Sequence, residues 1–594
     1  MSTTAEKIFL LRTKMLNLGI DAFIVPSSDP HMSEYTAAHW KKREFISGFT
    51  GSAGTVVVLI DEAGLWTDSR YYLQAEKELT DSGIDLFKAG EADTPDYVDW
   101  IAERLNPGSK IAFEGEVFSI DDARKLSKKY KHYGITLDPH QTLLDDIWEG
   151  RPPIPENTIF VHETKYAGLS RREKIENIRK KMRQQDGSHY LITALDEIAW
   201  TLNLRGNDVP FNPVFHAYLI ISLDAVYLFI DTHKITAPIG KELAEDDISV
   251  QLYSDIFEWV KEMPLESGLL FDPATTNARI FSLIPKEVIK IEKPSIVKDL
   301  KGLKNKTEQD GFRNAMVKDG VAMVKFLYWL EKNVPNGSVT ELSASKQLKK
   351  FRAENENFVG ESFGAISGFG AHGAIVHYSV SEETDIKLTP DNFYLIDSGG
   401  QYQEGTTDIT RTVHLGAPNE QQKSDFTMVL KGNIALGTTC FPAGTRGVHL
   451  DILARKPLWS KGLNYGHGTG HGVGCFLNVH EGPQSIRPND NGVAFEKGMI
   501  TSNEPGLYRT GQYGIRIENL LLTLESDHSE FGEFLKFETL TLCPIDLKSI
   551  ASSLLTHEEK LWINSYHKNV YDKISPYLDE ELQVWLKEQT KEIK

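Results

Sequence analysis

Cysteine is scarce in this sequence, and its few occurrences are widely spaced. The 594 residues include only three cysteines, Cys440, Cys475 and Cys543. A disulfide framework or a thiolate metal site needs more cysteines at closer spacings. We therefore exclude both and expect a protein of a reducing compartment.

Long hydrophobic runs are also missing. The best one, Thr55–Ile60, has the length of a strand and is far from the roughly 18 residues of a membrane-spanning helix. The first residues lack the apolar core and cleavage site of a secretory signal. Leu10, Leu11, Met15 and Leu18 fall at helical spacing instead, which predicts an amphipathic helix. We expect a soluble, cytoplasmic protein without a membrane partner.

Basic residues are fewer than acidic ones. Lysine and arginine total 65 against 84 aspartates and glutamates, which gives a net charge of −19. This balance disfavours a broad phosphate-binding surface, so we expect no nucleic-acid partner. A small cationic group, such as the free amino terminus of a peptide, suits this net negative charge better. With 40% hydrophobic and 25% charged residues, the composition is that of an ordinary globular protein.

A weak internal echo predicts two related α/β domains in the first half of the chain. The segment LLRTKMLNLGIDAFIV has the pattern of a helix, a glycine turn and a strand, and the same order recurs in ENIRKKMRQQDGSHYLIT near residue 175. Arg12 and Met15 of the first copy correspond to Arg179 and Met182 of the second. Apolar, β-branched runs follow each copy, as in successive α/β units.

Changes in composition place the domain limits. The proline-rich stretch Gly150–Pro155 has the character of a linker, so the first two domains are predicted at 1–152 and 153–303. A long helical pattern and then glycine-rich, threonine-rich and β-branched segments predict a strand-dominated domain at 304–540. Residues 541–594 return to a helical pattern.

Two helices of the second half have predicted caps and apolar faces. Thr307 can cap a long helix whose apolar face consists of Phe312, Met316, Met323, Leu327 and Leu330. A capping box of Thr556 and Glu559 begins a later helix, whose buried side is predicted to consist of Leu561, Trp562, Tyr566 and Val570.

The first segment with unusual chemistry joins two aspartates. An apolar strand ends near Asp397, a turn at Gly399–Gly400 follows, and a threonine-rich strand carries Asp408. As a hairpin, this pattern brings the two carboxylates face to face. Bare carboxylates would repel each other and share a proton, whereas with bound cations they become ligands. The alternative is a pair of turn aspartates that cap the hairpin.

The second segment, Gly466–Gly474, alternates glycine with other residues and contains His467 and His471. Histidines four residues apart resemble a zinc-binding helix, but the five glycines oppose a helix by about 1 kcal/mol each. An extended backbone fits better and separates the two imidazoles by about 13 Å, so only one would bind a given metal. A glycine-rich structural loop is the alternative.

Two glutamates complete the set of candidates. Glu504 precedes Pro505, which disfavours a helix and puts the carboxylate on a strand or a turn. Glu518 belongs to a period-two pattern in which isoleucines alternate with Arg516 and Glu518, as in a strand. A surface strand carrying a salt bridge is the alternative for Glu518.

All of these candidates can bind divalent cations: Asp397, Asp408, His471, Glu504 and Glu518. Their four carboxylates carry a ligand charge of about −4, which matches two divalent ions. Such an oxygen-rich set suits Mn²⁺, with Zn²⁺ or Co²⁺ as competitors. A pair of ions about 3.5–4 Å apart lowers the pKa of a shared water and holds it against a carbonyl, which is hydrolytic chemistry.

Five motifs in this order resemble the ligand pattern of the pita-bread metallopeptidases: Asp397, Asp408, the segment around His471, Asn503-Glu504-Pro505-Gly506 and Arg516-Ile517-Glu518-Asn519. The chain is most similar to the aminopeptidases P (Xaa-Pro aminopeptidases) of the three-domain cytosolic type, over essentially its whole length. The resemblance implies an α/β (α+β) fold with two creatinase-like amino-terminal domains, a pita-bread catalytic domain and a short helical extension. It also implies a homodimer.

The resemblance implies a role for each ligand. Asp408 and Glu518 are expected to bridge two metal ions, Asp397 to complete one site, and His471 and Glu504 to complete the other. Glu504 is also expected to move the proton of a metal-activated water that attacks the carbonyl before proline in an Xaa-Pro peptide.

Other residues are expected to serve the substrate. By resemblance, His377 contacts the bound peptide, His480 helps to hold the scissile carbonyl, and His467 lines the pocket. Arg70, in a Trp-Thr-Asp-Ser-Arg-Tyr segment, is expected to approach the active site, although such an arginine alone is typical of a structural salt bridge. Arg516 is a further candidate for substrate binding.

The sequence departs from the family pattern at two places. Leu507 stands where many relatives have an aromatic residue, and Ala371-His372 replaces a more usual Pro-Asn. Neither is a proposed ligand, and we expect an effect on side-chain preference around the substrate. His372 is predicted to be a loop residue.

Two alternative functions remain at this point. A prolidase-like Xaa-Pro dipeptidase would use the same metals, but prolidases usually have one amino-terminal domain. A catalytically inactive pita-bread binding protein is the alternative of a different class, and such relatives have lost metal ligands. Creatinase, which works without metal, and methionine aminopeptidases, which lack the two leading domains, fit less well.

Overall fold

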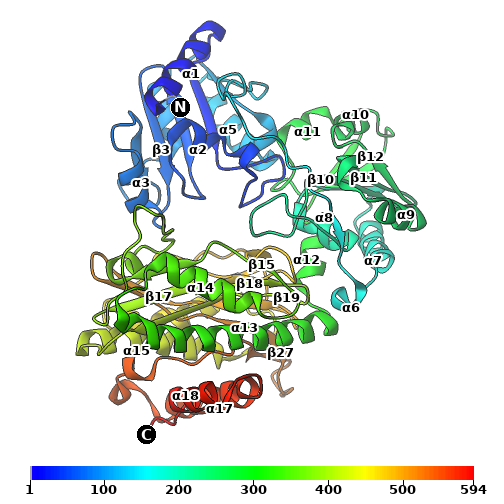
Figure 1. Ribbon diagram of the computed structural model, residues 1–594. Helices are drawn as coiled ribbons and strands as arrows, with labels where there is room; N and C mark the ends of the chain where they lie inside the picture. Colours follow the sequence, from blue (N-terminus) through cyan, green and yellow to red (C-terminus); the bar gives the residue numbers. More distant parts are fainter. Residues whose placement is uncertain (1–2) are drawn as a thin grey trace. The chain divides into compact units, whose positions relative to one another are not determined.

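The computed structural model describes residues 3–594 and contains two compact units (Figure 1). One unit comprises the chain up to His162 together with Leu169–Val297. The other comprises Glu163–Gly168 together with Lys298–Lys594. Helices and strands alternate in the first unit, and the second combines several small sheets with long helices.

The first unit contains two six-stranded sheets with the same topology. The strands of the first sheet are β1 (Ala22–Pro26), β2 (Thr55–Leu59), β3 (Ala63–Thr67), β4 (Asp85–Lys88), β5 (Lys110–Phe113) and β6 (Thr136–Asp138). Those of the second are β8 (His189–Ile192), β10 (Ala217–Ser222), β11 (Val226–Ile230), β12 (Ile248–Gln251), β13 (Gly268–Phe271) and β14 (Ile289–Glu292). The orders are β4-β3-β2-β1-β5-β6 and β12-β11-β10-β8-β13-β14. Each sheet has the same two antiparallel and three parallel pairs at equivalent places.

Helices cover these sheets. The main ones are α1 (Thr4–Leu18), α3 (Tyr72–Glu78), α4 (Tyr97–Arg104), α5 (Ile120–His132), α7 (Arg171–Gln184), α8 (Leu195–Leu202), α9 (Ala237–Glu245), α10 (Ile256–Lys261) and α11 (Ala278–Leu283). Between the two sheets, residues 151–159 form neither helix nor strand.

The arginine of the internal echo makes the same contact in both copies. Arg12 Nε donates to the carbonyl of Leu59 at 2.8 Å, and Arg179 Nε donates to the carbonyl of Ser222 at 3.0 Å. Leu59 ends β2 and Ser222 ends β10, which is the equivalent strand. The echo in the sequence is therefore a structural repeat in which a helix is joined to the end of the same strand.

Helix α1 has a different buried face from the predicted one. Ile8, Leu11 and Met15 are buried, whereas Leu10 and Leu18 are 45% and 49% exposed. Residues three and four positions apart lie on one face of a helix, and Leu10 lies beside that stripe. Leu18 has the spacing of the stripe but is the last residue of the helix, where it is left exposed. The helix is as predicted, but the assignment of these two leucines to its buried face is wrong.

The second unit is built around small antiparallel sheets. Its strands are β15 (Phe358–Glu361), β16 (Ile366–Phe369), β17 (Phe393–Ser398), β18 (Gly400–Tyr402), β19 (Gly405–Thr406), β20 (Ile409–His414), β21 (Cys440–Pro442), β22 (Gly470–Gly472), β23 (Glu481–Ile486), β24 (Ile500–Asn503), β25 (Gly506–Arg509), β26 (Tyr513–Arg516), β27 (Asn519–Glu525) and β28 (Phe534–Thr539). The larger sheet has the order β21-β28-β27-β24-β22-β23, and a smaller one has the order β16-β17-β20. The five predicted metal ligands lie on the strands of these two sheets or directly beside them.

Long helices flank these sheets. They are α12 (Ile296–Gly302), α13 (Lys306–Asn333), α14 (Glu341–Ala353), α15 (Glu420–Gly437), α16 (Gly447–Trp459), α17 (His557–Ile574) and α18 (Glu580–Gln589). The predicted apolar residues of α13 are all buried, but its cap is Asn305. The Asn305 side chain accepts from the backbone of Glu308, so the helix begins before Thr307 and the prediction of Thr307 as the cap is wrong.

The carboxy-terminal helices pack on α13 and α15 (Figure 1). The predicted capping box of Thr556 and Glu559 begins α17. Tyr566 and Val570 are buried as predicted, whereas Leu561 is 52% exposed and Ile563 takes its place on the buried face.

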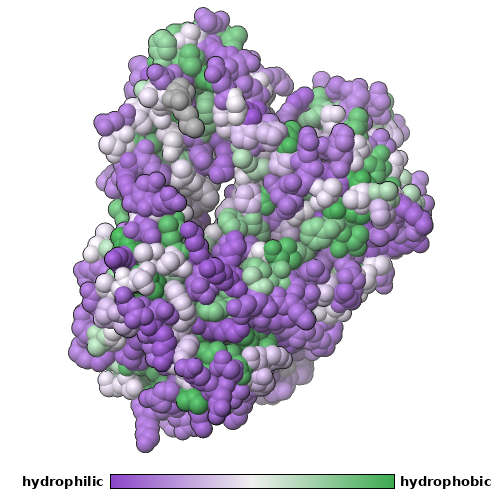
Figure 2. All heavy atoms as spheres, in the orientation of Figure 1, coloured by the Kyte–Doolittle hydropathy of each residue, from purple (hydrophilic) through white to green (hydrophobic). Residues whose placement is uncertain are grey.

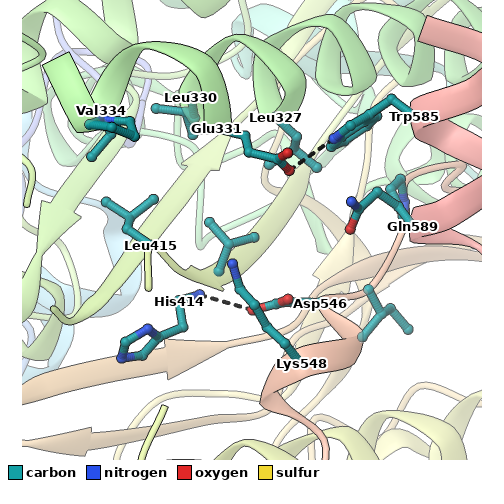
Figure 3. A pocket seen from close by; sticks show the side chains of 14 residues that line it. Leu327, Leu330, Glu331, Val334, His414, Leu415, Asp546, Lys548, Trp585 and Gln589 are labelled. Atoms are coloured by element: carbon teal, nitrogen blue, oxygen red, sulfur yellow. Dashed lines mark hydrogen bonds between the residues drawn. The ribbon is translucent and has the colours of Figure 1, made fainter. Parts of the chain in front are cut away.

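A pocket of about 90 Å³ lies where α18 meets α13 and the end of β20 (Figure 3). Trp585 Nε1 donates to Glu331 at 2.9 Å, and the backbone of His414 donates to Asp546 at 2.9 Å. None of the predicted site residues lines this pocket. Trp585 and Gln589 of α18 form part of its lining.

The visible surface is mostly hydrophilic, with hydrophobic residues in small separate patches (Figure 2). None of the helices in residues 3–594 combines the length and the apolarity needed to cross a lipid bilayer.

Candidate metal centre

Two aspartates lie on or directly beside the paired strands β17 and β20, as the hairpin pattern predicts. Asp397 is opposite Thr410 in the antiparallel register, and Asp408 immediately precedes β20. The connection contains β18 and β19, so it is longer than a simple turn. Both aspartates are buried. Aspartates that only cap a turn have no physical reason to be buried together, so the structure favours a ligand role.

The glycine-rich segment is extended, as predicted. Gly470–Gly472 form β22, which pairs with β23 and β24. A Cβ atom at Gly470 would overlap the carbonyl oxygen of Ser502, so glycine is required for this close approach. The strand places His471 among the carboxylates, with its Nε2 atom 3.5 Å from Asp408 Oδ2 and 3.4 Å from Glu504 Oε1.

The second ring nitrogen of His471 sets its tautomer. Nδ1 lies 2.9 Å from the carbonyl oxygen of Gly472. A carbonyl only accepts, so Nδ1 carries the proton and the lone pair is on Nε2. Nε2 is the atom that faces the carboxylates, and this is the orientation of a histidine prepared to bind a metal.

The two glutamates lie in connections between strands. Glu504 follows β24, and Glu518 lies in the gap between β26 and β27, where the predicted continuous strand is interrupted. Ser502 Oγ donates to Glu504 Oε1 at 3.1 Å, and Thr410 Oγ1 donates to Glu518 Oε2 at 2.8 Å. Glu518 is only 1% exposed, which excludes the alternative of a surface salt bridge.

Three of the candidates meet closely enough to share a metal ion. Asp408, His471 and Glu518 each offer a ligand atom, and these atoms all lie within 4.8 Å of one another. Glu504 adjoins the group through His471. The negative charge of Asp397 raises the pKa values of Asp408 and Glu518, so Asp397 lies near these two carboxylates as well.

Crowding of buried carboxylates raises their pKa values. Burial, and then the charges of Asp397 and Glu504, raise the pKa of Asp408 well above its ordinary value. Burial, and then Asp408, do the same to the pKa of Glu518. Burial raises the pKa of Glu504 to about 7, although the Arg516 guanidinium opposes this effect. Without a cation, the fold thus favours protonated acids at this place.

The residues fit a divalent metal. Asp397 Oδ1 is buried and has no hydrogen-bond donor, whereas Asp397 Oδ2 accepts from Arg516. A buried carboxylate oxygen without a donor is costly unless a cation binds it. Clustered carboxylate oxygens with one imidazole are the donors that Mn²⁺, Co²⁺ and Zn²⁺ accept.

Arg516 lies behind the ligands and not on an open surface. It is 2% exposed, and its Nη2 atom donates to Asp397 Oδ2 at 2.7 Å. Its Nε atom donates to Thr410 Oγ1 at 3.2 Å, and Thr410 in turn donates to Glu518. Arg516 therefore orients the carboxylate of Asp397 directly and that of Glu518 through Thr410.

Tyr508 connects Arg516 to His467. Arg516 Nη1 donates to the Tyr508 hydroxyl at 2.6 Å, and this hydroxyl lies 2.8 Å from His467 Nε2. His467 Nδ1 lies 2.7 Å from the carbonyl of Gly468, so Nδ1 carries the proton and Nε2 accepts from Tyr508. Tyr508 was not a candidate from the sequence, although it stands two residues after the Glu504 motif that drew attention to the segment.

The other two histidines also lie beside the cluster. The His480 ring packs edge-on against the His471 ring, with 4.4 Å between centroids. The charge of His480 lowers the pKa values of both Asp408 and Glu504. His377 follows Val376, whose carbonyl lies 3.4 Å from Arg516 Nη2. The structure therefore brings His377, His467 and His480 to the region of the predicted ligands.

A buried ion pair on α16 holds the loop of His467. Arg455 Nε donates to Asp451 at 2.7 Å, and the two terminal nitrogens of Arg455 donate to the carbonyls of Tyr465 and His467, each at 2.7 Å. Thr469 Oγ1 donates to Asp451 at 2.6 Å. The sequence carried only a weak signal for this pair, which is its helical i, i+4 spacing.

Arg70 lies in the first unit, where it forms an ion pair with Asp68. The Arg70 Nε and Nη2 atoms each lie 2.8 Å from a carboxylate oxygen of Asp68. The salt bridge that is typical of such an arginine is therefore present.

Both departures from the family pattern have structural roles. Leu507 is buried in a hydrophobic core, and its effect on preference around the substrate stays a prediction. His372 lies in a 3₁₀ helix, Gly370–Ala374, and not in an irregular loop. Its Nδ1 atom lies 3.0 Å from each carboxylate oxygen of Glu341.

Known protein families match successive parts of this chain. Two models described as the Creatinase/Prolidase N-terminal domain match residues 8–147 and 150–308. The model of Metallopeptidase family M24 matches residues 310–525, and that of the C-terminal region of peptidase_M24 matches residues 533–593.

Full-length relatives decide the assignment. A protein of Coprinopsis cinerea named probable Xaa-Pro aminopeptidase P is 41% identical over 611 aligned residues, which cover 99% of this chain and 98% of the relative. The chain belongs to the aminopeptidase P family. Aminopeptidase P2 of Arabidopsis thaliana is also 41% identical, over 96% of this chain and 85% of that protein. The family resemblance predicted from five short motifs is thereby confirmed.

Solved structures agree with this assignment to the aminopeptidase P family. The crystal structure of an X-prolyl aminopeptidase from Caenorhabditis elegans, described as a cytosolic enzyme with a di-nuclear active site, has a TM-score of 0.96, 35% identity and full coverage of both chains. A prolidase of Thermococcus sibiricus covers 64% of this chain with 21% identity and a TM-score of 0.52, which shows a shared fold. The predicted fold class, with creatinase-like domains and a pita-bread domain, is confirmed.

Proposed function

We propose that this chain is a metal-dependent aminopeptidase that hydrolyses the amino-terminal Xaa-Pro bond of peptides. The cluster of Asp408, His471 and Glu518 carries this proposal, because its ligand atoms lie close enough to hold a metal ion within a matched metallopeptidase domain. Alignment of the whole chain with Xaa-Pro aminopeptidases supports the bond specificity. A peptide substrate presents a free ammonium group, which suits a site rich in carboxylates.

Two divalent ions are the proposed cofactor. Asp408 and Glu518 would bridge the ions, Asp397 would complete one site, and His471 and Glu504 would complete the other. When bound, such a pair lowers the pKa of a water molecule and polarises a carbonyl oxygen. The di-nuclear active site of the Caenorhabditis elegans relative supports the number of ions. Manganese is the proposed metal, with zinc or cobalt as alternatives, because carboxylate oxygens dominate the donor set.

Glu504 is the proposed general base. Its carboxylate lies beside His471 Nε2, at the edge of the ligand cluster. It takes a proton from the attacking water and delivers it to the proline nitrogen as the peptide bond breaks. That delivery is needed because the proline nitrogen must gain a proton to leave as a secondary amine when the C–N bond breaks.

Three histidines are proposed to bind the peptide and to stabilise its reacting carbonyl. His377 and His480 would donate to the substrate as negative charge develops on the carbonyl oxygen. His467, hydrogen-bonded to Tyr508, would line the pocket. Arg70 stays a proposed substrate contact, and Arg516 is proposed to act on the substrate through the orientation of Asp397.

The wider properties are proposals of the same kind. We propose a cytoplasmic homodimer, with domain limits at 1–152, 153–303, 304–540 and 541–594. The cytosolic description of the Caenorhabditis elegans relative supports the location. A prolidase-like dipeptidase is the alternative activity, and the two matched amino-terminal domains disfavour it. An inactive binding protein is disfavoured because all five ligand positions keep their donors.

A metal-supplemented peptide assay tests the proposal. The full chain loaded with Mn²⁺ is expected to release arginine from Arg-Pro-Pro, identified by mass spectrometry, and to cleave an Xaa-Pro dipeptide far more slowly. The variant Asp408→Ala should lose both metal and turnover, because it removes a bridging ligand. Faster cleavage of the dipeptide would favour a prolidase, and full activity of the variant would contradict the assigned site.

A further inference from the structure

One carboxylate holds both ends of the segment that carries His377. Glu341 is the first residue of α14 and is 0% exposed. Its Oε1 atom accepts from the backbone N–H of Phe369 at 2.7 Å, and its Oε2 atom accepts from the hydroxyl of Tyr378 at 3.1 Å. Phe369 directly precedes the segment 370–377, and Tyr378 directly follows it. The segment is thus closed into a loop by the side chain of Glu341.

His372 makes a third contact with the same carboxylate from within the segment. Its Nδ1 atom lies 3.0 Å from both oxygens of Glu341, and its ring lies 4.5 Å from the ring of Tyr378. A carboxylate accepts, so Nδ1 is the donor. Among residues 3–594, His372 is the basic residue whose side chain contacts the Glu341 carboxylate. A fully buried carboxylate depends on such donors, because each unsatisfied oxygen carries a desolvation cost.

The other side of the segment rests on bare backbone. A Cβ atom at Gly373 would lie 3.3 Å from the backbone nitrogen of Gly514 in β26, and one at Gly514 would overlap the carbonyl of Gly373. The segment is therefore confined between β26 and the Glu341 cluster, which we define as Glu341, His372 and Tyr378. On the β26 side, Arg516 Nη2 makes one long contact with the carbonyl of Val376, at 3.4 Å. The Glu341 cluster supplies shorter, directional bonds on the other side, so it helps to determine where the end of the segment at His377 lies.

We infer that Glu341, His372 and Tyr378 are positioning residues for His377 and thereby set the affinity for the peptide substrate. This inference rests on the proposed function, in which His377 contacts the peptide. None of the proposed metal ligands belongs to segment 370–377, so the cluster acts on the peptide and not on the metal.

A double-mutant cycle tests the inference on the full, Mn²⁺-loaded chain. The variant His372→Ala/Tyr378→Phe removes two of the three contacts and leaves Glu341 hydrogen-bonded to Phe369. We expect KM for an Xaa-Pro-Xaa tripeptide to rise about tenfold, kcat to change less than about threefold, and the bound metal to stay unchanged. Tyr328→Phe, which removes a tyrosine–carboxylate bond to Glu581 on the same unit, is the matched control and should leave KM unchanged.

The His377→Ala background separates positioning from general damage. If the cluster acts through His377, adding the double variant to the His377→Ala background should raise KM by less than about a further twofold. A full additive loss would overturn the inference, as would an unchanged KM in the original background. Replacing His372 by asparagine instead of alanine restores a side-chain donor. His372→Asn is therefore expected to recover part of the substrate affinity that the double variant loses.

Hydrogen exchange gives a second measurement that does not depend on activity. Amides of residues 369–378 should exchange faster in the double variant than in the wild type, and the Tyr328→Phe control should not change them. If the wild-type chain failed to cleave Xaa-Pro peptides, the proposed function would fall while this measurement still reported on the cluster. Unchanged exchange in this segment would overturn the positioning role.

Discussion

Arg516 donates to Asp397 across 2.7 Å, and this contact leaves the other oxygen of the aspartate without a donor. The arginine is fully enclosed, and its remaining nitrogens are engaged by Thr410 and Tyr508. A buried guanidinium with several hydrogen-bond partners is held in one orientation. It therefore holds the carboxylate in one orientation, with Oδ1 available for a cation.

Removing Arg516 should weaken metal binding. Arg516→Met is expected to lower metal affinity by about 10- to 100-fold, because residues that orient metal ligands have effects of that size. Metal titration of the EDTA-treated protein measures the change. Tyr508→Phe keeps the contact to Asp397 and should have a much smaller effect. Equal affinity of Arg516→Met and wild type would show that Asp397 does not need this orientation.

The metal-free protein should become less stable as pH rises. The folded-state pKa of Glu504 is raised to about 7, above its ordinary value of 4.5, so the protonated form is favoured by the fold. Stability is therefore greatest below the unfolded pKa and falls as pH rises from about 4.5 through about 7. Glu504→Gln removes this penalty and should stabilise the metal-free chain at pH 8 by up to about 3 kcal/mol.

Urea unfolding in EDTA at pH 5 and pH 8 checks this expectation. The gain from Glu504→Gln should be present at pH 8 and small at pH 5. With metal bound, the wild type should be more stable than Glu504→Gln, because glutamine removes a proposed ligand. A variant that is less stable than wild type at pH 8 in EDTA would contradict the raised pKa.

Metal binding should release protons. Burial and mutual repulsion raise the pKa values of Asp408 and Glu518, so these acids hold protons that a cation must displace. Affinity for Mn²⁺ should accordingly fall as pH is lowered. Calorimetry in buffers with different ionisation enthalpies measures the released protons. A binding heat that does not depend on the buffer would exclude this coupling.

Glu481 should be essential for stability. Its carboxylate lies 2.6 Å from Lys301 Nζ and 2.7 Å from Lys304 Nζ, and all three side chains are buried. Glu481→Gln would remove the carboxylate charge that two buried ammonium groups share, and we expect a loss of about 3–5 kcal/mol in the free energy of unfolding. Denaturant unfolding measures it.

A partly exposed ion pair serves as the control for Glu481. Glu538 pairs with Arg313 at 2.6 Å, and both side chains are about 30% exposed. Glu538→Gln should cost less than about 1 kcal/mol, because solvent screens such pairs. Similar losses in the two variants would contradict the argument from burial.

Arg455 should affect activity more than stability. Arg455→Lys keeps a positive charge for Asp451 but loses the paired contacts to the carbonyls of Tyr465 and His467. We expect kcat/KM to fall about tenfold or more as the loop shifts, while the melting temperature changes little. Steady-state assays and thermal unfolding check both. A parallel loss of stability and activity would indicate a purely structural role.

Backbone chemistry explains why much of this site was predictable. Alternating glycines indicated an extended segment at His471, and Pro505 excluded a helix at Glu504; the structure has both features. Such constraints depend on a few neighbouring residues. Burial was harder to predict, since Leu10 and Leu18 have the helical spacing of an apolar face and yet are exposed. Which stripe of a helix is covered depends on the sheet beneath it.

The order and kind of the ligand residues, the α/β character and the family were determined by the amino-acid sequence alone, because donor chemistry and local backbone limits are properties of short segments. Only the tertiary structure decided which groups stand behind the ligands. Arg516 and Asp397 are 119 positions apart, and His372 and Glu341 are 31 apart. Their partnership arises from burial, which removes water and makes each charged group depend on the few side chains that the fold brings within reach.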